Sequence, residues 1–493
     1  MNILMIYPTF PDTFWSFKHA LSFVGKKAAF PPLGLATVAG LLPKDWNKRI
    51  VDQNVTSLKD SDLLWADYAF ISAMIIQKTS AVEDIKRCNA IGLKVVAGGP
   101  LFTMEPEEFD SVDHFVLNEA EITLPLFLDD LEQGVPKKIY ETENFAVMAE
   151  SPLPEWDLID MKQYQSMSIQ FSRGCPFDCD FCNITALLGR RVRIKNATQI
   201  IREIDSLYTF GWRRGNIFFV DDNFIGNKRY LKEDLLPALI DWRKNKQGIR
   251  FQTEASINLA DDAELMKMMA DAGFDNVFVG IESTDDNALA ECNKKQNVHR
   301  DLVEDVKKIQ RAGLQVQGGF IVGFDNDKPS VFQSQIDFIQ KSGIVTAMVG
   351  LLQAPQSTKL YKRLQKEGRL CGSSSGDNVE GTTNIIPKME LKTLLKGYRD
   401  ILNYIYEPRN YYERVKVLLK EYKAPKVRVI LRWTDMMALI RSVYRLGIMG
   451  RERVYYWKLL FWTSLRKPTL IPLAVTLAIS GYHFRKVCEL RVH

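Results

Sequence analysis

Three cysteines on one short loop constrain this chain more than any other feature. They lie in the run Phe171-Ser-Arg-Gly-Cys-Pro-Phe-Asp-Cys-Asp-Phe-Cys182, which has the spacing C-x3-C-x2-C. Each thiolate can bind one iron of a cubane cluster, so three protein ligands leave the fourth iron open. Clusters that only transfer electrons normally have a cysteine on every iron. Cys175, Cys179 and Cys182 therefore predict a [4Fe-4S] cluster that a small molecule completes.

A zinc knuckle is the alternative interpretation of these cysteines. Zinc needs four ligands, commonly in two pairs, and no second Cys or His pair lies nearby. The spacing instead resembles the radical S-adenosylmethionine (SAM) superfamily, and Phe181 is the aromatic residue usual between the last two cysteines. That resemblance implies that the amino and carboxylate groups of SAM bind the open iron.

Length and cysteine usage restrict the class of protein. A chain of 493 residues exceeds one ordinary core, so we expect two or three domains. Seven cysteines give no even disulfide framework, and the four outside the loop are scattered. This favours the reducing cytoplasm, where a cluster survives. The first residues lack a basic segment and a cleavage site, so we expect a strand there and no signal peptide.

Charge is unevenly distributed. Residues 409–493 contain 18 Lys and Arg against 5 Asp and Glu, although the whole chain has a formal net charge of only +5. We expect a basic C-terminal region with affinity for a negatively charged partner. Leu470–Phe484 is apolar between basic pairs but shorter than the roughly 20 residues that span a bilayer. It predicts a buried helix, with a helix on the membrane surface as the alternative.

Short apolar strands alternate with helices in residues 1–135, which predicts a doubly wound parallel sheet. Ligands bind such sheets beyond the carboxyl ends of the strands, where Gly98 and Gly99 lie. The expected strands are Ile3–Tyr7, Arg49–Val51, Tyr68–Ala73, Val95–Ala97 and His114–Leu117.

The alternation restarts after a connector at residues 136–164. Six strand–helix units in residues 165–370 fit the partial (β/α)6 barrel of radical SAM enzymes, with the cysteine loop just after the first strand. Chemistry in such barrels occurs at the carboxyl ends of the strands. Residues 371–493 are expected to form a basic helical domain. The predicted class is thus α/β, with a doubly wound domain, a partial barrel and a helical C-terminal region.

Polar groups and glycines at the strand ends suggest how the barrel holds SAM. Carboxylates there can bind the SAM ammonium or ribose, and paired glycines let backbone approach the adenine. The Gly319–Gly323 strand resembles the superfamily's adenine-contacting G-x-I-x-G strand. The candidate SAM-binding residues are Asp221, Asp222, Glu254, Glu282, Gly319 and Gly323.

The first domain resembles the cobalamin-binding domain found ahead of many radical SAM barrels. That family's signature is D-x-H-x-x-G, then S-x-L, then G-G. Here Asn54 replaces the histidine, so the resemblance implies cobalamin without a protein histidine on cobalt. Docking onto the barrel or binding another nucleotide is the alternative role. The candidate cobalamin-binding residues are Asp52, Asn54, Ser72, Gly98 and Gly99.

Motifs along the whole chain, among them Phe30-Pro-Pro-Leu-Gly-Leu35 and Val220-Asp-Asp-Asn-Phe-Ile-Gly226, resemble one cobalamin-dependent radical SAM subfamily. It contains the hopanoid methylases and the bacteriochlorophyllide side-chain methyltransferases. The resemblance implies methylation of an unactivated carbon, with methyl transfer through cobalamin and radical chemistry from a second SAM. A radical cyclase or rearrangement enzyme without methyl transfer is the alternative.

The substrate is expected to be a small molecule, either a tetrapyrrole or a lipid. Aromatic residues in the basic C-terminal region, such as Trp433 and Trp457, favour the flat macrocycle of a bacteriochlorophyllide over a hopanoid. The resemblance implies an electron donor such as ferredoxin or flavodoxin. We expect no nucleic-acid partner, and a cytoplasmic location with peripheral membrane contact as an option.

Overall fold

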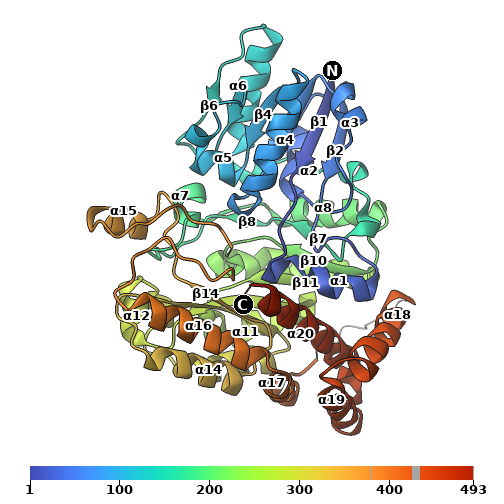
Figure 1. Ribbon diagram of the computed structural model, residues 1–493. Coiled ribbons are helices and arrows are strands. Elements are labelled where there is room, and N and C mark those ends of the chain that lie inside the picture. The colour runs from blue at the N-terminus through green and yellow to red at the C-terminus, as the bar shows by residue number, and fades with distance from the viewer. Residues whose placement is uncertain (378, 425–432, 492–493) are drawn as a thin grey trace.

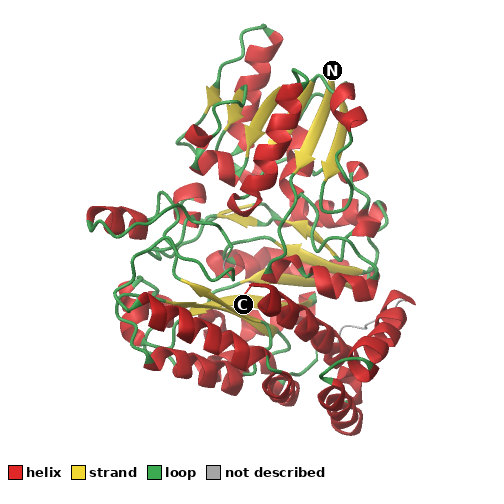
Figure 2. Cartoon of the chain, in the orientation of Figure 1, coloured by secondary structure: helices red, strands yellow, loops and turns green. Residues whose placement is uncertain are grey.

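The computed structural model describes residues 1–377, 379–424 and 433–491. It contains two six-stranded parallel sheets, one formed by residues 2–140 and the other by residues 166–351. The N-terminal sheet and its helices lie above the second sheet, and the C-terminal helices pack beside the second sheet (Figure 1). Figure 2 shows that helices cover both faces of the upper sheet.

The first sheet has the strand order β2-β1-β3-β4-β5-β6, and all its strands are parallel. The order reverses between β1 and β3, which is where a doubly wound sheet opens a crevice for ligands. Its sixth strand comes from the segment expected to be a connector. The strands are β1 (Asn2–Tyr7), β2 (Asn47–Asp52), β3 (Tyr68–Ser72), β4 (Lys94–Gly98), β5 (His114–Val116) and β6 (Ile139–Tyr140), and the main helices are α2 (Leu33–Leu41), α3 (Asp60–Trp65), α4 (Lys78–Ala90), α5 (Pro100–Met104) and α6 (Ala120–Glu132).

The second sheet is a partial barrel with its strands in chain order, as the sequence predicts. Six parallel strands run from β7 at one edge to β14 at the other. The strands are β7 (Ser166–Ile169), β10 (Gly215–Phe219), β11 (Ile249–Glu254), β12 (Phe274–Glu282), β13 (Gln315–Val322) and β14 (Ala347–Leu351), and the main helices are α8 (Ala197–Thr209), α10 (Leu236–Asn245), α11 (Ala263–Ala272), α13 (Leu302–Arg311) and α14 (Ser330–Ser342).

Burial alternates along the barrel strands and distinguishes their two faces. In β12, Val277, Val279 and Ile281 are fully buried in the main hydrophobic core. Phe278 and Gly280, between them, are only half-buried. Because successive side chains of a strand point to opposite faces, the half-buried set faces the inside of the barrel.

The C-terminal helices pack against the barrel and one another. They are α15 (Lys359–Lys366), α16 (Leu391–Tyr406), α17 (Pro408–Glu421), α18 (Trp433–Ser442), α19 (Arg453–Arg466) and α20 (Ile471–Arg491), with a π-helical turn at Val443–Ile448 after α18. The apolar run of α20 is largely buried, as its sequence predicts: Ala474, Ala478 and Phe484 are inaccessible to solvent. Among the described residues, no helix is both long and apolar enough to cross a membrane.

Gly481 allows α20 to lie directly on α17, because a Cβ there would come 2.3 Å from the ring of Tyr411. We expect Gly481→Ala to destabilise the protein by ~1–3 kcal/mol through overpacking. Gly34→Ala in α2 is the matched control, since a Cβ there meets nothing within 4 Å. Calorimetry should show a lower melting temperature for the first variant alone; equal shifts would contradict the packing.

Candidate active site

The carboxyl edges of the two sheets face each other, and buried ion pairs connect them. Glu119, which follows β5, accepts hydrogen bonds from Arg173 at 3.0 Å and from Arg193 at 2.5 Å. Glu121 accepts from Arg173 at 2.7 Å. Arg173 and Arg193 lie in the short antiparallel ribbon β8–β9 (Ser172–Arg173, Arg193–Ile194) that carries the cysteine loop. This cluster of two arginines and two glutamates therefore aligns the first domain with the loop.

The charges in this cluster are tightly coupled. Although burial alone raises the pKa of Glu121, hydrogen bonds and charge from Arg173 outweigh it and hold that pKa at about 2. All four side chains are at most 14% exposed. The low pKa of Glu121 keeps its carboxylate charged at neutral pH, beside the guanidinium of Arg173.

The cysteine loop begins at a glycine that no other residue can replace without strain. Gly174 has a φ of +91°, and a Cβ there would come 2.8 Å from the carbonyl oxygen of Arg191. Phe171 and Ser172 lie just before this glycine. The buried Asp221 accepts hydrogen bonds from the backbone of Phe171 and from the backbone and hydroxyl of Ser172. Burial raises the pKa of Asp221 to about 7, against the lowering effect of these bonds. Asp221 thus positions the entrance of the loop.

The loop that carries the three thiols is held by hydrogen bonds to residues 292–296. Asn293 donates to the carbonyl of Asp178 at 2.7 Å, and the nitrogen of Asp180 donates to the carbonyl of Cys292 at 3.0 Å. Gln296 reaches the sulfur of Cys179 at 3.9 Å. Burial raises the pKa of all three thiols, that of Cys182 to about 12, so iron would have to displace their protons.

No three His, Cys, Asp or Glu side chains among the described residues converge on a point that could hold a single metal ion. A cubane cluster does not ask for such convergence, because each of its thiolates binds a different iron. Three free cysteines on one pinned loop fit the cluster and do not fit a tetrahedral zinc site.

Two further carboxylates face the inside of the barrel near the thiols. Asp222 is half-buried as a residue, but its Oδ2 is a buried atom without a hydrogen-bond partner among the described residues. Burial raises the pKa of Asp222 to about 6. Burial, and then repulsion from Asp222 and Asp221, raises the pKa of Glu254 to about 8. An unsatisfied carboxylate beside a second one fits a cationic ligand such as SAM.

Glu282 is already paired. Lys294 donates to it at 2.8 Å, and both side chains are at most 13% exposed. Burial opposes the charge of Lys294, but Glu282 outweighs it and raises the lysine's pKa. Glu282 also has a φ of +64°, and a Cβ on Gly280 would collide with its carboxylate. The carboxylate therefore lies against the strand beside the cysteine loop.

The two candidate glycines lie on β13 and just after it. A Cβ on Gly319 would come 2.8 Å from the ring of Phe278 on the inner face of β12. Gly323 has a φ of +108°, and its nitrogen donates to Asp327 at 2.8 Å. Glycine is thus required at both positions, by a close approach at one and by backbone conformation at the other.

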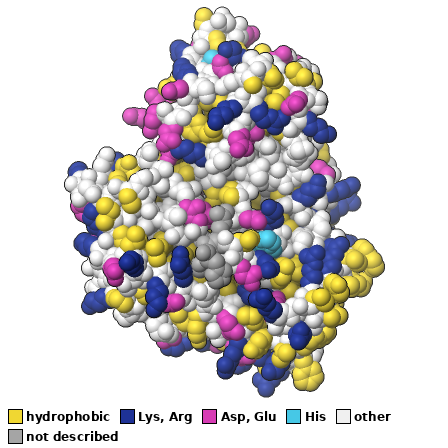
Figure 3. All heavy atoms as spheres, viewed as in Figure 1, with side chains coloured by type: hydrophobic (Ala, Val, Ile, Leu, Met, Phe, Trp, Pro, Cys, Tyr) yellow, Lys and Arg dark blue, Asp and Glu magenta, His cyan; other side chains and the backbone are white. Residues whose placement is uncertain are grey.

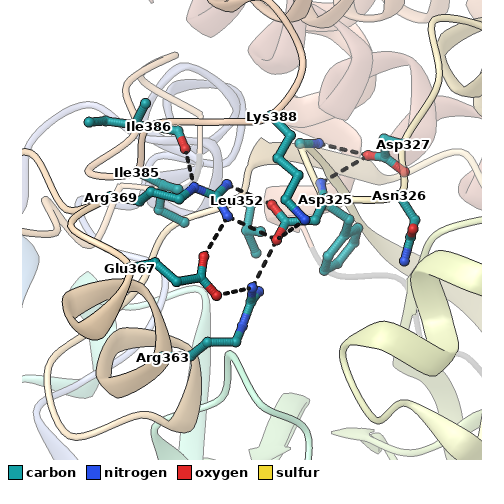
Figure 4. A network of polar contacts seen from close by, with 12 residues as sticks. Asp325, Asn326, Asp327, Leu352, Arg363, Glu367, Arg369, Ile385, Ile386 and Lys388 are labelled. Carbon is teal, nitrogen blue, oxygen red and sulfur yellow. Dashed lines mark hydrogen bonds and ion pairs between the residues drawn. The ribbon is translucent and has the colours of Figure 1, made fainter.

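The loop after β13 is held by a cation cluster (Figure 4). Asp325 accepts from Arg369 at 2.6 Å and from Arg363 at 2.8 Å, and Lys388 lies 3.4 Å away. Burial would raise the pKa of Asp325, but the arginines outweigh it and hold it well below its usual range. This cluster fixes the candidate adenine strand against α15 and the following loop.

Strand register places apolar side chains beside Glu254 and Gly319. Glu254 pairs with Phe278, and Gly319 pairs with Met348. Trp15, from the first domain, covers both: its ring lies 5.4 Å from that of Phe278, and its Nε1 lies 3.0 Å from the sulfur of Met348. The first domain therefore contributes an aromatic wall to the inside of the barrel.

At the carboxyl edge of the first sheet, the glycine pair forms a small backbone cradle. A Cβ on Gly99, whose φ is +89°, would lie 2.7 Å from the hydroxyl oxygen of Ser72. A Cβ on Gly98 would lie 2.7 Å from the carbonyl oxygen of Val116. Close packing of the strand ends thus requires both glycines, at the edge where a doubly wound sheet binds ligands, which fits cobalamin.

Asp52 and Asn54 lie at the same edge but bond within the protein. Asp52 accepts from the hydroxyl of Tyr164 at 2.8 Å and from Asn54. The Asn54 amide donates to the carbonyl of Pro8 at 3.2 Å and accepts from the nitrogen of Phe10 at 2.8 Å. Asn54 therefore closes the loop after β1, and its bonded amide does not replace a histidine ligand.

Sequence reasoning missed three contributors to this site. Glu119 and Glu121 carried no local signal, because their partners are more than 50 residues away. The hydrogen bonds of Arg173 go to the first domain and to Gln170. No sequence pattern links Trp15 to the barrel.

Two family models match the chain. The radical SAM superfamily model matches residues 169–339, and a domain of unknown function matches residues 358–493. The latter begins at the turn before α15, so the Asp325 cluster joins the two matched regions.

Relatives cover nearly all of the chain. An uncharacterized methyltransferase of Synechocystis sp. is 40% identical over 99% of this chain and 92% of its own length. The hopanoid C-2 methylase of Rhodopseudomonas palustris is 33% identical over 93% of this chain and 88% of its own. The bacteriochlorophyllide d C-12(1)-methyltransferase of Chlorobaculum tepidum is 25% identical over 70% and 76%.

Solved structures share the fold. The radical SAM methyltransferase TsrM of Kitasatospora setae, solved with cobalamin and a [4Fe-4S] cluster bound, superimposes over the whole of both chains with a TM-score of 0.65. Its sequence identity is 14%. The arrangement of sheet, barrel and helices is therefore shared well beyond recognisable sequence similarity.

Glu119 balances two arginines out of water, so its charge should matter to stability. We expect Glu119→Gln to lower the free energy of unfolding by ~3–5 kcal/mol, because it leaves buried cations uncompensated. Glu233→Gln, in the exposed pair with Arg229, is the matched control and should cost no more than ~0.5 kcal/mol. Thermal unfolding measures both, and similar melting temperatures would show that the cluster does not join the domains.

Proposed function

Because this chain belongs to the cobalamin-dependent radical SAM methyltransferase family, we propose that it methylates an unactivated carbon of a large apolar substrate, with a hopanoid lipid as first candidate. The observation that carries the proposal is the set of buried ion pairs that turns the edge with the cysteine loop and inner carboxylates toward the edge with Gly98 and Gly99. Full-length similarity to a hopanoid methylase supports the same conclusion.

Each cofactor has candidate residues in the protein. Cys175, Cys179 and Cys182 would hold three irons of the cluster. Asp222 and Glu254 would pair with the cationic groups of SAM, and Gly319 and Gly323 would admit its flat base. The Gly98–Gly99 turn would take cobalamin. Together these groups supply hydrogen abstraction from carbon and a transferable methyl group, while the protein orients them.

The chain's own residues would bind, orient and exclude water. Asp221 sets the course of the cysteine loop, and Glu119 and Glu121 hold the first domain over it through Arg173 and Arg193. Trp15, Phe278 and Met348 line the inner face with apolar groups. Radical chemistry requires this exclusion of water, because it prevents side reactions of the reactive species.

An apolar lipid suits this wall better than the pigment first expected. Trp433, Trp457 and Phe461, which suggested a macrocycle site, are all exposed on α18 and α19 and do not line the barrel. The relative acting on hopanoids is also more similar than the one acting on bacteriochlorophyllide. Bacteriochlorophyllide is the second candidate, which two less similar relatives support. We also propose a ferredoxin or flavodoxin as the electron donor.

Anaerobic turnover with methyl-labelled SAM tests the function. With a hopanoid present, we expect label in the lipid together with S-adenosylhomocysteine and 5′-deoxyadenosine. Cys182→Ala should lose the cluster's absorbance and form no 5′-deoxyadenosine, whereas Cys371→Ala, an exposed thiol outside the loop, should behave as wild type.

Two outcomes would redirect the proposal. Labelled bacteriochlorophyllide in a parallel reaction, with unlabelled hopanoid, would identify the pigment as substrate. Formation of 5′-deoxyadenosine with no labelled product from either compound would contradict methyl transfer and favour a cyclase or rearrangement.

Affinity for SAM should depend on pH through the two inner carboxylates. Both have raised pKa values, about 6 for Asp222 and about 8 for Glu254, so protons compete with a cationic ligand below these values. We expect binding to tighten as the pH rises from about 6 and to level off above about 8, by at most about tenfold per unit. Equilibrium dialysis measures the affinity for SAM at each pH, and Glu254→Gln should remove the rise in affinity near pH 8. A wild-type profile without slope would exclude Glu254 from the site.

A further inference from the structure

The surface of α18 and α19 is unusually apolar for a protein surface. Large hydrophobic side chains gather over these helices in Figure 3. Isolated exposed apolar residues are normal, but a contiguous group marks an interaction site. The most exposed members are Trp433, Met436, Ile440, Tyr444, Ile448, Met449, Val454, Trp457, Phe461 and Leu465.

On α19 these residues form a regular outer stripe. Val454, Trp457, Phe461 and Leu465 are spaced by three or four residues, which places them on one face of the helix. Tyr456, Leu459 and Thr463 are buried and lie on the opposite face. The helix is therefore apolar on two sides, and packing within the protein uses only one of them.

Basic side chains border the stripe. Arg451, Arg453 and Lys458 are exposed, and no ion pair to an acidic residue is found for them in the described parts of the chain. Arg466 lies over the ring of Trp462, 5.7 Å from its centroid. Trp, Tyr and Phe beside Arg and Lys are the composition of helices that lie in a membrane interface.

We propose that the face formed by α18, the π-helical turn and α19 docks onto a bilayer that contains anionic lipid. The apolar stripe enters the boundary between headgroups and acyl chains, and the basic residues meet the lipid phosphates. Either signal alone gives only marginal attachment, and the two together give stable peripheral binding.

Charge argues against a second copy of the chain as the occupant of this face. From residue 433 to residue 470 the sequence has seven Lys and Arg and two Asp and Glu. A two-fold interface would bring this excess of positive charge against itself, which is unfavourable. An anionic surface removes that repulsion.

The docking face connects to the barrel through the N-terminal segment. Arg441 donates to the carbonyl of Phe23 at 2.9 Å and Arg445 to the hydroxyl of Ser22 at 2.7 Å, both in α1 (Lys18–Val24). The same segment carries Trp15 into the barrel. A lipid substrate would thus reach the apolar inner face formed by Trp15, Phe278 and Met348 from the membrane side. This link rests on the proposed function, whereas the docking itself does not.

Vesicle co-sedimentation tests the docking without substrate or cofactor turnover. We expect the full chain to bind phosphatidylcholine vesicles containing phosphatidylglycerol, to bind pure phosphatidylcholine at least about tenfold more weakly, and to dissociate as salt screens the charges. Because activity is not measured, failure of the methylase proposal would leave this result intact.

Matched double variants separate the stripe from general hydrophobicity. Phe461→Ser with Leu465→Ser removes side chains that are 67% and 69% exposed, and should weaken vesicle binding by about 100-fold. Phe210→Ser with Leu64→Ser removes side chains that are 51% and 74% exposed elsewhere, and should leave it unchanged. Melting temperatures check that both variants fold.

Three results would overturn the proposal. One is absence of wild-type binding to either vesicle, and another is equal loss in both double variants. The third is a wild-type dimer, seen by sedimentation velocity, that Phe461→Ser with Leu465→Ser converts to a monomer, because the face would then belong to a second copy. If the stripe variant fails to fold, the salt dependence of vesicle binding by the wild-type protein still tests the proposal, because binding that salt does not weaken would contradict it.

Discussion

The site depends on buried ion pairs between two sheets that have no strand in common. Parallel strands collect their functional groups at one edge, so a site that needs two such edges requires them to face each other at a fixed separation. Arg173 and Arg193 provide this, because each bonds to carboxylates of the first domain from the ribbon that carries the cysteine loop. Hydrophobic contact alone is non-directional and would not define the register between the edges.

Asp221 and Asp222 are adjacent at the end of one strand and have different roles, one in holding the cysteine loop and the other in facing a ligand. Asp221 points back to the loop and its oxygens are bonded to three donors, so it organises the protein. Asp222, the next residue, keeps one buried oxygen without a hydrogen-bond partner among the described residues. A buried carboxylate without a partner costs stability, which the fold tolerates where a cationic ligand would restore the balance.

Local pattern was sufficient for most of the fold. The strands of both sheets were located because their apolar runs are bounded by glycine and charged residues, and the barrel order follows from chain order. β6 was missed because two residues, Ile139 and Tyr140, are too short to show a period. The cysteine loop and the carboxylates at strand ends were visible for the same reason, since their places follow from strand boundaries alone.

What the sequence did not show lies in contacts between distant residues. Asn54 was aligned with a cobalt-binding position, but only the structure reveals that its amide bonds to Pro8 and Phe10 across the loop. Likewise Glu119 immediately precedes α6 and would be taken for an ordinary acid at a helix N-terminus, where negative charge is favourable by itself. Its two arginine partners come from the other half of the fold, and periodicity carries no information about them.

The C-terminal helices illustrate the same limit for surfaces. The apolar run of α20 was predicted to form a buried helix, and it is buried because α16, α17 and α19 surround it. In α19 the apolar residues fall on two faces, so its sequence alone resembles that of a core helix and does not show which face is covered. Tyr456 and Leu459 fill the inner face completely. The outer stripe is therefore surplus to folding, and its retention beside uncompensated arginines is best explained by a surface outside the protein that is itself apolar and negatively charged.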